Sequence, residues 1–327
     1  MTIRPIKWLK NSQLTLTLDP IAYVVNSLAM GDVIAAAAVI KHQLDNAYVT
    51  PESHTVVAKS RYRELFPHVS DSNWVDFEST DRPQWGIDPS TPIALFNHSA
   101  QGKIVRNTPK KVHLLTYASY KLTDSIIPLD QLHYVPLTTV PIDSSIDWSR
   151  AVILVSTYRD TTRRWPAKHM LEFATWLLAN QYIPVFVGKT DMEVGTNQQP
   201  RTELPADLSQ YGIDLRDRTT IPQLATMMSK CLAVTGVDSG PIHLAGTTSA
   251  TIICGYPTVS PELRIPSRAK GITIPLVPQM ECGGCESRWN TSYWNFQQCY
   301  LGHADCCEHF TADRYISALQ TVIGNAA

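Results

Sequence analysis

The chain has 327 residues, which is enough for two domains of about 150 residues each, and its 44 % hydrophobic and 17 % charged residues can build full cores. A net charge of −1 gives no overall attraction to nucleic acid or to an anionic membrane. The longest apolar candidate, Val33 to Ile40, is well short of the ~18 residues of a membrane span, and no signal-peptide core precedes it. We therefore expect a soluble, cytoplasmic protein.

The first half of the chain alternates short apolar runs with helical segments. Ile21 to Val25 predicts a buried strand, followed by a glycine turn and an Ala-rich helix that ends near Leu44. Further strands are predicted at residues 55–58, 74–77 and 92–97, with a short helix from Ser60 to Phe66 that Pro67 ends. This order is typical of βα units, which form parallel sheets.

The pattern restarts after residues 136–150, a proline-containing segment that we interpret as the linker. Strands are predicted at 151–156, 183–187, 231–235 and 251–254, with helices at 166–180, 221–230, 241–246 and 311–323. The fold class is therefore α/β. We expect two Rossmann-like domains, residues 1–147 and 148–327, facing each other across a cleft, because ligands bind outside the carboxyl ends of parallel strands.

The segment from Val234 to Gly246 is the strongest candidate for a binding site. It predicts the end of a buried strand, a tight turn, and a helix for which Ser239 is a plausible N-cap. Gly240 permits close approach of a ligand to the backbone, and Asp238 and His243 lie on either side of it in sequence. Such a helix start can bind phosphate, although an ordinary strand-to-helix turn has the same composition.

Five of the seven cysteines lie between residues 282 and 307, and the odd total argues against a disulfide framework. Four of these thiols have a spacing compatible with a tetrahedral structural zinc site, and two histidines could replace one of them. The four are Cys282, Cys285, Cys299 and Cys306, followed by the vicinal Cys307; the histidines are His303 and His309. Reduced buried thiols or a disulfide are the alternatives. No paired carboxylates indicate a catalytic metal, and we expect no catalytic cofactor.

Four segments, taken together, resemble the motifs of one enzyme family. Val237 to Ala245 is similar to a D-[ST]-G-x-x-H-[LA]-A signature, and Ala29 to Val33 to an S-M-G-D-[VL] turn. Ser156 to Pro166 has a short basic run before W-P, and Pro184 to Gly188 is a strand ending in glycine, with the acidic Asp191 nearby. The segments occur in the family's order over most of residues 21–260. The chain thus resembles the heptosyltransferase-like glycosyltransferases of family 9, which have the GT-B architecture.

The resemblance implies roles for particular residues. Inverting glycosyl transfer needs a base for the acceptor hydroxyl and an electropositive site for the leaving nucleoside diphosphate. The family's catalytic carboxylate corresponds to Asp32, which could instead cap the Ala-rich helix. The donor-binding residues would be Ser156, Thr157, Arg163, Arg164, Ser239, Gly240 and His243, with Asp238 orienting the loop. The family usually has lysine where Arg163 stands, so either arginine could supply the charge.

We therefore expect an inverting, metal-independent glycosyltransferase that binds a nucleotide-diphosphate sugar in residues 148–327 and an acceptor in residues 1–147. The resemblance implies that the acceptor is a lipopolysaccharide-type glycan. The alternatives are transfer to hydroxymethylated DNA bases, a sugar-nucleotide epimerase, and a non-catalytic nucleotide-binding module. The DNA alternative depends on a modest basic cluster, Lys103, Arg106, Lys110 and Lys111. An NAD-dependent oxidoreductase is disfavoured because no G-x-G-x-x-G follows a predicted strand.

Overall fold

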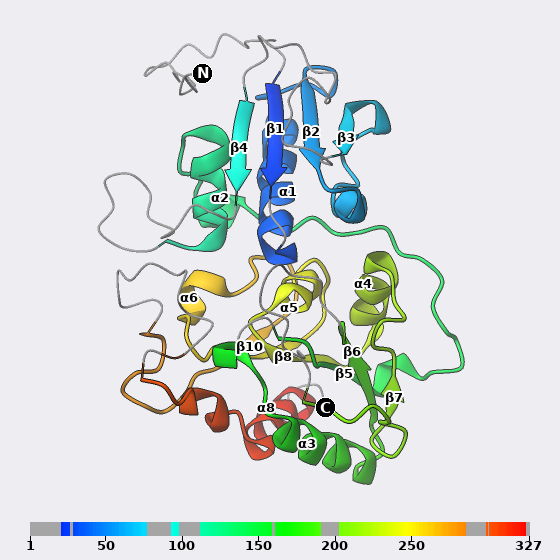
Figure 1. Ribbon diagram of the computed structural model, residues 1–327. Coiled ribbons are helices and arrows are strands. Elements are labelled where there is room, and N and C mark those ends of the chain that lie inside the picture. Colours follow the sequence, from blue (N-terminus) through cyan, green and yellow to red (C-terminus); the bar gives the residue numbers. More distant parts are fainter. Residues whose placement is uncertain are drawn as a thin grey trace. The chain divides into compact units, whose positions relative to one another are not determined.

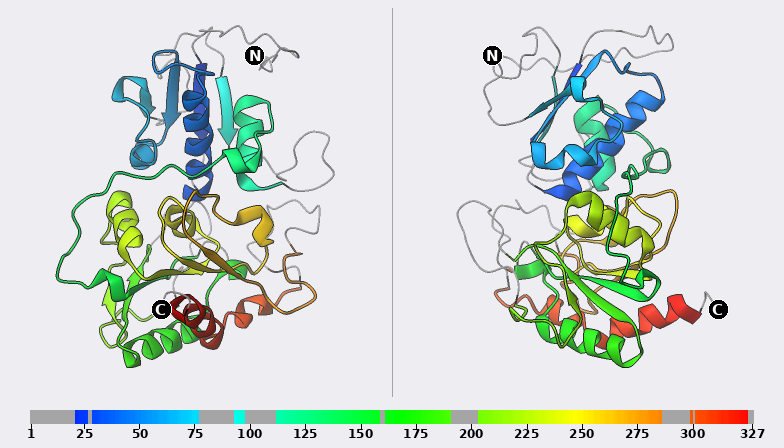
Figure 2. Two further views of the ribbon diagram at one scale, coloured as in Figure 1. Left: turned by 180° about the vertical axis from the view of Figure 1, so that it is seen from behind. Right: turned by 90° about the vertical axis from the view of Figure 1, so that its right-hand side faces the viewer.

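The computed structural model describes residues 21–26, 29–76, 93–97, 112–158, 161–190, 203–285, 299 and 301–324. The chain divides after Leu137 into two compact units, Met1–Leu137 and Thr138–Ala327. In each unit, helices pack against a sheet whose described strand pairs are all parallel (Figures 1 and 2). Of the helices within the described ranges, none combines the length and the apolar character needed to cross a bilayer.

Unit 1 contains a four-stranded sheet in the order β3-β2-β1-β4. The strands are β1 (Ile21–Asn26), β2 (His54–Ala58), β3 (Trp74–Asp76) and β4 (Ile93–Asn97). The helices α1 (Met30–Asp45) and α2 (Leu114–Thr123) pack against each other on one face of the sheet (Figure 2). The segment predicted as a helix after β2 is a 3-10 helix, η1 (Ser60–Leu65), and η2 (Asp71–Asn73) and η4 (Leu129–Gln131) are shorter 3-10 turns.

The Ala-rich character of α1 suits its position. Residues from Val33 to Ile40 are all at most 2 % exposed, so this helix is buried around most of its circumference rather than along one stripe. Small alanine side chains let the backbone of α1 approach its neighbours closely. The first turn of α1 follows β1 after a short connection, which places it at the carboxyl edge of the sheet.

Unit 2 contains a six-stranded sheet in the order β10-β9-β8-β5-β6-β7. The strands are β5 (Ala151–Val155), β6 (Ile183–Val187), β7 (Ile213–Asp214), β8 (Ala233–Val237), β9 (Ile252–Gly255) and β10 (Thr273–Leu276). The longer helices α3 (Ala167–Ala179) and α8 (Ala312–Gly324) pack together on one face, and α4 (Ile221–Lys230) and α5 (Gly240–Ala245) on the other (Figure 1). The short elements are η5 (Trp148–Arg150), η6 (Thr161–Arg163), α6 (Pro261–Arg264) and η8 (Asp305–His309).

The core of unit 2 joins the end of the chain to the sheet. The ring of Tyr315 in α8 stacks on Trp165 with 3.8 Å between ring centroids, and both side chains are buried. The Tyr315 hydroxyl donates a hydrogen bond of 2.8 Å to the backbone carbonyl of Gly236 in β8. The segment after β8, which carries the candidate binding motif, therefore follows a strand that α8 holds in place through this hydrogen bond.

The segment that we interpreted as a linker belongs largely to unit 2. The Val140 amide donates to the hydroxyl of Thr226 in α4 at 3.0 Å, and the Trp148 indole N–H donates to the carbonyl of Asp143 at 2.8 Å. The division after Leu137 thus lies ten residues before the expected boundary at 147.

Candidate functional site

The polar residues of the predicted binding motif lie at the carboxyl edge of the unit 2 sheet. Ser156 directly follows β5, and its amide donates to the carbonyl of Val187 at the end of β6 at 3.0 Å. Asp238 directly follows β8, and its amide donates to the carbonyl of Gly255 at the end of β9 at 3.0 Å. Neighbouring strands therefore hold these two loops side by side, at the edge where parallel sheets bind ligands.

Asp238 is the centre of a buried charged cluster. Its side chain is only 3 % exposed, and its Oδ2 accepts a hydrogen bond from Nη1 of Arg163 at 3.2 Å. Its Oδ1 lies 3.4 Å from Nε2 of His243, whose side chain is 4 % exposed. Burial alone would raise the pKa of Asp238, but the hydrogen bond from His243 and the charge of Arg163 outweigh it and hold the pKa below its ordinary value. The carboxylate thus fixes a guanidinium and an imidazole beside the start of α5.

The start of α5 presents an unused hydroxyl. Ser239 occupies the N-cap position with extended backbone, as predicted, but its side chain makes no capping hydrogen bond. Its Oγ is buried and has no hydrogen-bond partner in the structure. Because a buried hydroxyl without a partner is costly, this atom is a candidate ligand-binding group. Gly240 and Pro241 follow as the first helical residues.

Ser156 and Thr157 are buried, and their hydroxyl groups are engaged within the sheet edge. Ser156 Oγ donates to the Val187 carbonyl at 3.0 Å. Thr157 Oγ1 donates to the Lys189 carbonyl at 3.1 Å and accepts from the Lys189 amide at 2.6 Å. Their hydroxyl protons are directed at backbone carbonyls, so these two residues shape the turn after β6 and would have to rearrange to bind a phosphate.

The two adjacent arginines differ in their surroundings. Arg163 contacts the buried Asp238, whereas Arg164 donates to Glu203 Oε1 and Glu308 Oε1, each at 2.9 Å. Both acidic partners of Arg164 are at least 40 % exposed. The structure therefore separates the two residues that the sequence left equivalent, because only Arg163 belongs to the charged cluster. Neither Glu203 nor Glu308 could have been identified as a partner from sequence.

In unit 1, the candidate carboxylate Asp32 lies in the first turn of α1. The N-cap of this helix is Ala29, so the capping role that the sequence offered for Asp32 is not the one it has. Asp32 is only 6 % exposed, although it stands near the end of the helix. A nearly buried carboxylate at the carboxyl edge of a parallel sheet is a typical arrangement for a catalytic base.

Two buried tyrosines lie close to Asp32, and sequence analysis identified neither of them. Burial, with a smaller contribution from the Asp32 carboxylate, raises the pKa of Tyr117 in α2 to about 12. Burial and the same carboxylate also raise the pKa of Tyr62 in η1, against the opposing effect of Arg61, whose guanidinium lies over the Tyr62 ring at 4.9 Å from its centroid. Both phenols are therefore neutral hydrogen-bonding groups around the carboxylate at physiological pH.

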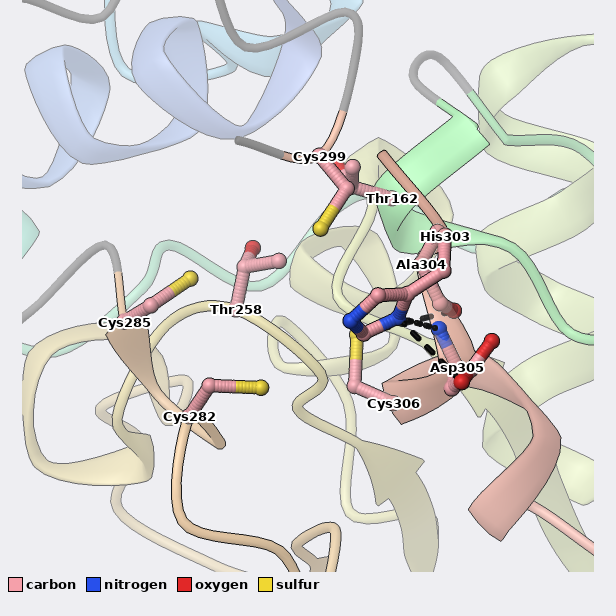
Figure 3. Close-up of a pocket in the computed structure, with 9 residues that line it drawn as sticks. All are labelled: Thr162, Thr258, Cys282, Cys285, Cys299, His303, Ala304, Asp305 and Cys306. Atoms are coloured by element: carbon pink, nitrogen blue, oxygen red, sulfur yellow. Dashed lines mark hydrogen bonds and ion pairs between the residues drawn. The ribbon is translucent and has the colours of Figure 1, made fainter. Parts of the chain in front are cut away.

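Four of the five cysteines between residues 282 and 307 line one pocket (Figure 3). Its lining residues that could bind a metal come from three separate segments: Cys282 and Cys285, Cys299, and His303, Asp305 and Cys306. All seven cysteines are free thiols, so the disulfide alternative is not realised in the structure. Within the described ranges, no three histidine, cysteine, aspartate or glutamate side chains are arranged closely enough to hold a metal ion. His303 instead contacts its neighbour Asp305, with Nδ1 3.3 Å from Oδ2.

Other sequence-based expectations fall on residues that the structure does not describe. These are the basic cluster on which the DNA alternative depends and the acidic residue near the end of β6: Lys103, Arg106, Lys110, Lys111 and Asp191.

Two parallel sheets flanked by helices, with charged residues gathered at the carboxyl edge, define an α/β protein built from two Rossmann-like domains. Residues 130–291, just under half of the chain, match the family model described as glycosyltransferase family 9 (heptosyltransferase), the family that the sequence motifs resemble. The match includes β5 to β10, the Asp238 cluster and two of the pocket cysteines.

One relative by sequence and two solved structures are similar to this chain. Lipooligosaccharide heptosyltransferase 2 of Haemophilus influenzae is 28 % identical over 116 residues, which are 35 % of this chain and 33 % of the relative, so the matched region spans about a third of that protein. TibC of enterotoxigenic E. coli H10407, an iron-containing dodecameric heptosyltransferase solved with ADP-D-beta-D-heptose, has a TM-score of 0.72 at 12 % identity, covering 96 % of this chain and 78 % of TibC.

The E. coli ADP-heptose lps heptosyltransferase II has a TM-score of 0.58 at 14 % identity, covering 94 % of this chain and all of the other. At these low identities the structural similarities establish the fold. The chain has the GT-B fold of the heptosyltransferases, as the sequence resemblance implied.

Proposed function

We propose that the chain is an inverting glycosyltransferase that transfers a sugar from a nucleotide-diphosphate donor, of the ADP-heptose kind, to a hydroxyl of a lipopolysaccharide-type glycan. The observation that carries the proposal is the buried Asp238 cluster. It places a guanidinium, an imidazole and an unpartnered serine hydroxyl at the carboxyl edge of the sheet, in the half of the chain that matches glycosyltransferase family 9. The solved relative TibC, which has the same fold, binds ADP-D-beta-D-heptose.

Arg163, Ser239, Gly240 and His243 would bind the donor diphosphate. A guanidinium has hydrogen-bond donors arranged to match phosphate oxygens, and partial burial strengthens its interaction with a developing charge. Asp238 would take no part in the chemistry but would keep Arg163 and His243 in position. Because these protein groups can neutralise the leaving nucleoside diphosphate, we propose that the reaction needs no metal ion at the diphosphate. Ser156 and Thr157 would support the loop through their contacts with the end of β6.

Asp32 would accept the proton of the acceptor hydroxyl while that oxygen attacks the anomeric carbon. The bond from this carbon to the diphosphate oxygen breaks as the new bond forms on the opposite face. A single displacement of this kind inverts the configuration at the anomeric carbon. Unit 1 would thus bind the acceptor and unit 2 the donor.

The test is an assay of the purified chain with ADP-heptose and a panel of other nucleotide sugars, with and without truncated lipopolysaccharide core. Release of nucleoside diphosphate that depends on the acceptor is expected, and NMR of the product should show an inverted anomeric centre. Asp32→Asn should lower turnover by about two to four orders of magnitude, with donor affinity within about threefold of wild type. Conversion of donor without acceptor would instead indicate an epimerase. Absence of nucleotide binding by calorimetry would contradict the proposal.

We also propose that the cysteine pocket holds a structural metal ion, with Cys282, Cys285, Cys299 and Cys306 as ligands. Four thiols around one pocket are the donor set that zinc and iron prefer, and metal binding commonly draws ligands together that stand apart in its absence. TibC is described as iron-containing, which makes iron the alternative to the zinc that the sequence suggested. Elemental analysis of the purified chain and of Cys282→Ser distinguishes the two metals. Equal metal content in the two proteins would contradict the assignment.

A further inference from the structure

Three consecutive residues around η6 contact three different parts of unit 2. Thr162 lines the cysteine pocket, Arg163 donates to Asp238 at 3.2 Å, and Arg164 donates to Glu308 at 2.9 Å. A 3-10 helix has three residues per turn, so successive side chains diverge by about 120° and can contact separate neighbours. The short segment thus contacts both the pocket, where Figure 3 shows Thr162, and the charged cluster.

The segment that contacts η6 is η8, which carries both a pocket cysteine and the acidic partner of Arg164. Cys306 lines the pocket, and Glu308 follows two residues later in the same 3-10 helix. η6 packs against η8, and the indole N–H of Trp165 donates to the carbonyl of Phe310 at 2.9 Å. The far end of η8 is therefore fixed to the core, whereas its cysteine end lines the pocket. A pocket cysteine and the acidic partner of Arg164 therefore lie within one turn of the same helix.

We propose that the cysteine pocket and the diphosphate site are coupled, and that Glu308 is the positioning residue that couples them. When a thiophilic metal ion holds the four cysteines, η8 is fixed at both ends. Glu308 then holds Arg164, and with it the backbone of η6, so that Arg163 remains in place for the donor diphosphate. The inference rests on the proposed function, because it takes the Asp238 cluster as the site of the diphosphate.

The ion pairs of Arg164 offer a matched pair of variants. Glu203 and Glu308 both accept from Arg164 at 2.9 Å, and their side chains are 40 % and 50 % exposed. Exposed ion pairs contribute little to folding stability, so neither substitution should unfold the chain. Only Glu308 lies in the segment that carries a pocket cysteine. If Arg164 needs only a neutralising negative charge, the two variants should bind ADP with the same affinity.

The experiment is calorimetric titration of ADP into metal-loaded wild type, Glu308→Gln and Glu203→Gln, with circular dichroism as the folding control. We expect Glu308→Gln to weaken ADP binding by about three- to tenfold, the range typical of a residue that acts through another, and Glu203→Gln to stay within about twofold of wild type. Removal of the metal with a chelator should weaken ADP binding to wild type and have a much smaller effect on Glu308→Gln, because the coupling is already broken. In the transfer assay, Glu308→Gln should raise the KM for the donor and leave the KM for the acceptor unchanged.

The possible outcomes separate this inference from the proposed function. Equal ADP affinity of Glu308→Gln and wild type overturns the coupling and leaves the proposed function intact. Equal weakening by the two glutamate variants also overturns the coupling, since the effect would then come from the charge of Arg164 alone. A wild-type chain that binds no ADP or other nucleoside diphosphate overturns both.

Discussion

Arg163 and Asp238, 75 positions apart in the sequence, form a hydrogen-bonded ion pair of 3.2 Å in which the carboxylate is almost fully buried. Asp238 is also the partner of His243, so one acidic side chain orients two groups that can carry positive charge. A buried carboxylate is stable only with such partners. The pair therefore holds the loop and the side chains of Arg163 and His243 in place at the edge of the sheet.

Replacement of Asp238 by asparagine should weaken both the fold and the diphosphate site. We expect Asp238→Asn to lower the free energy of unfolding by about 1–3 kcal/mol and ADP affinity by about tenfold, because Arg163 and His243 lose their charged partner. The pKa of Asp238 is below its ordinary value, so its contribution to stability is complete above about pH 4 and is lost as the pH falls through the folded-state pKa. Urea denaturation of the two proteins should therefore converge below about pH 4. A constant difference down to pH 2 would contradict this account.

The two arginines of the basic run should respond differently to substitution. Arg163→Ala should weaken ADP binding by about tenfold or more, whereas Arg163→Lys should retain most of it, because a lysine keeps the charge beside Asp238 and loses only the forked geometry. Calorimetry with ADP measures both effects. Arg218→Ala, at an exposed position in the same unit, is the control and should bind ADP like wild type. Normal ADP affinity of Arg163→Ala would remove this residue from the donor site.

His68 in unit 1 should make the fold sensitive to mild acid. Both of its ring nitrogens are buried without hydrogen-bond partners, and burial, aided by the nearby charge of Lys41, lowers its pKa to about 3. The unfolded chain binds a proton near pH 6.5 and the folded chain does not. Stability is therefore complete above pH 6.5 and should fall by up to about 1.4 kcal/mol per pH unit as the pH decreases toward 3.

Substitution of His68 by phenylalanine removes the group that binds this proton in the unfolded chain. Between pH 6.5 and 4.5, the free energy of unfolding of His68→Phe, from urea denaturation, should fall less steeply with decreasing pH than that of wild type. The two slopes should differ by the amount that corresponds to about one bound proton. His133→Gln, at an exposed position in the same unit, should keep the wild-type slope. Parallel slopes for His68→Phe and wild type would show that another group causes the acid sensitivity.

Gly188 at the end of β6 should tolerate no side chain. Its φ of +133° is a conformation that residues with a Cβ rarely adopt, and a Cβ there would overlap the hydroxyl of Thr157. Since Thr157 also bonds the backbone of Lys189, Gly188→Ala should disturb the whole turn and lower the thermal midpoint by about 5 °C or more. Differential scanning fluorimetry measures the shift. Gly324→Ala, at the end of α8 with open space around it, is the control.

The elements that sequence analysis missed or misassigned have local causes. The strand β10 (Thr273–Leu276) contains Pro275 and was not predicted, but it lies at the edge of its sheet, where a missing amide N–H is tolerated. The helix α2 was not predicted either; its N-cap is His113, an unusual residue for that position. The sequence predicts a helix from Ser60 to Phe66, and the structure has the 3-10 helix η1 (Ser60–Leu65) there, a difference in hydrogen bonding that apolar periodicity does not reveal.

The order of the βα units, the two-domain α/β fold and the family resemblance could all be obtained from the sequence, because they depend on local periodicity and on short motifs read in order. The partners of the charged residues depended on the tertiary structure. Arg163 meets Asp238, and Arg164 meets Glu308, 144 positions away, only because the parallel strands bring their carboxyl ends together and the end of the chain packs beneath the same sheet. Charge pairs across such separations leave no pattern in a single sequence, so only the fold could distinguish the arginine that pairs with the buried Asp238 from its neighbour, which pairs with two exposed glutamates.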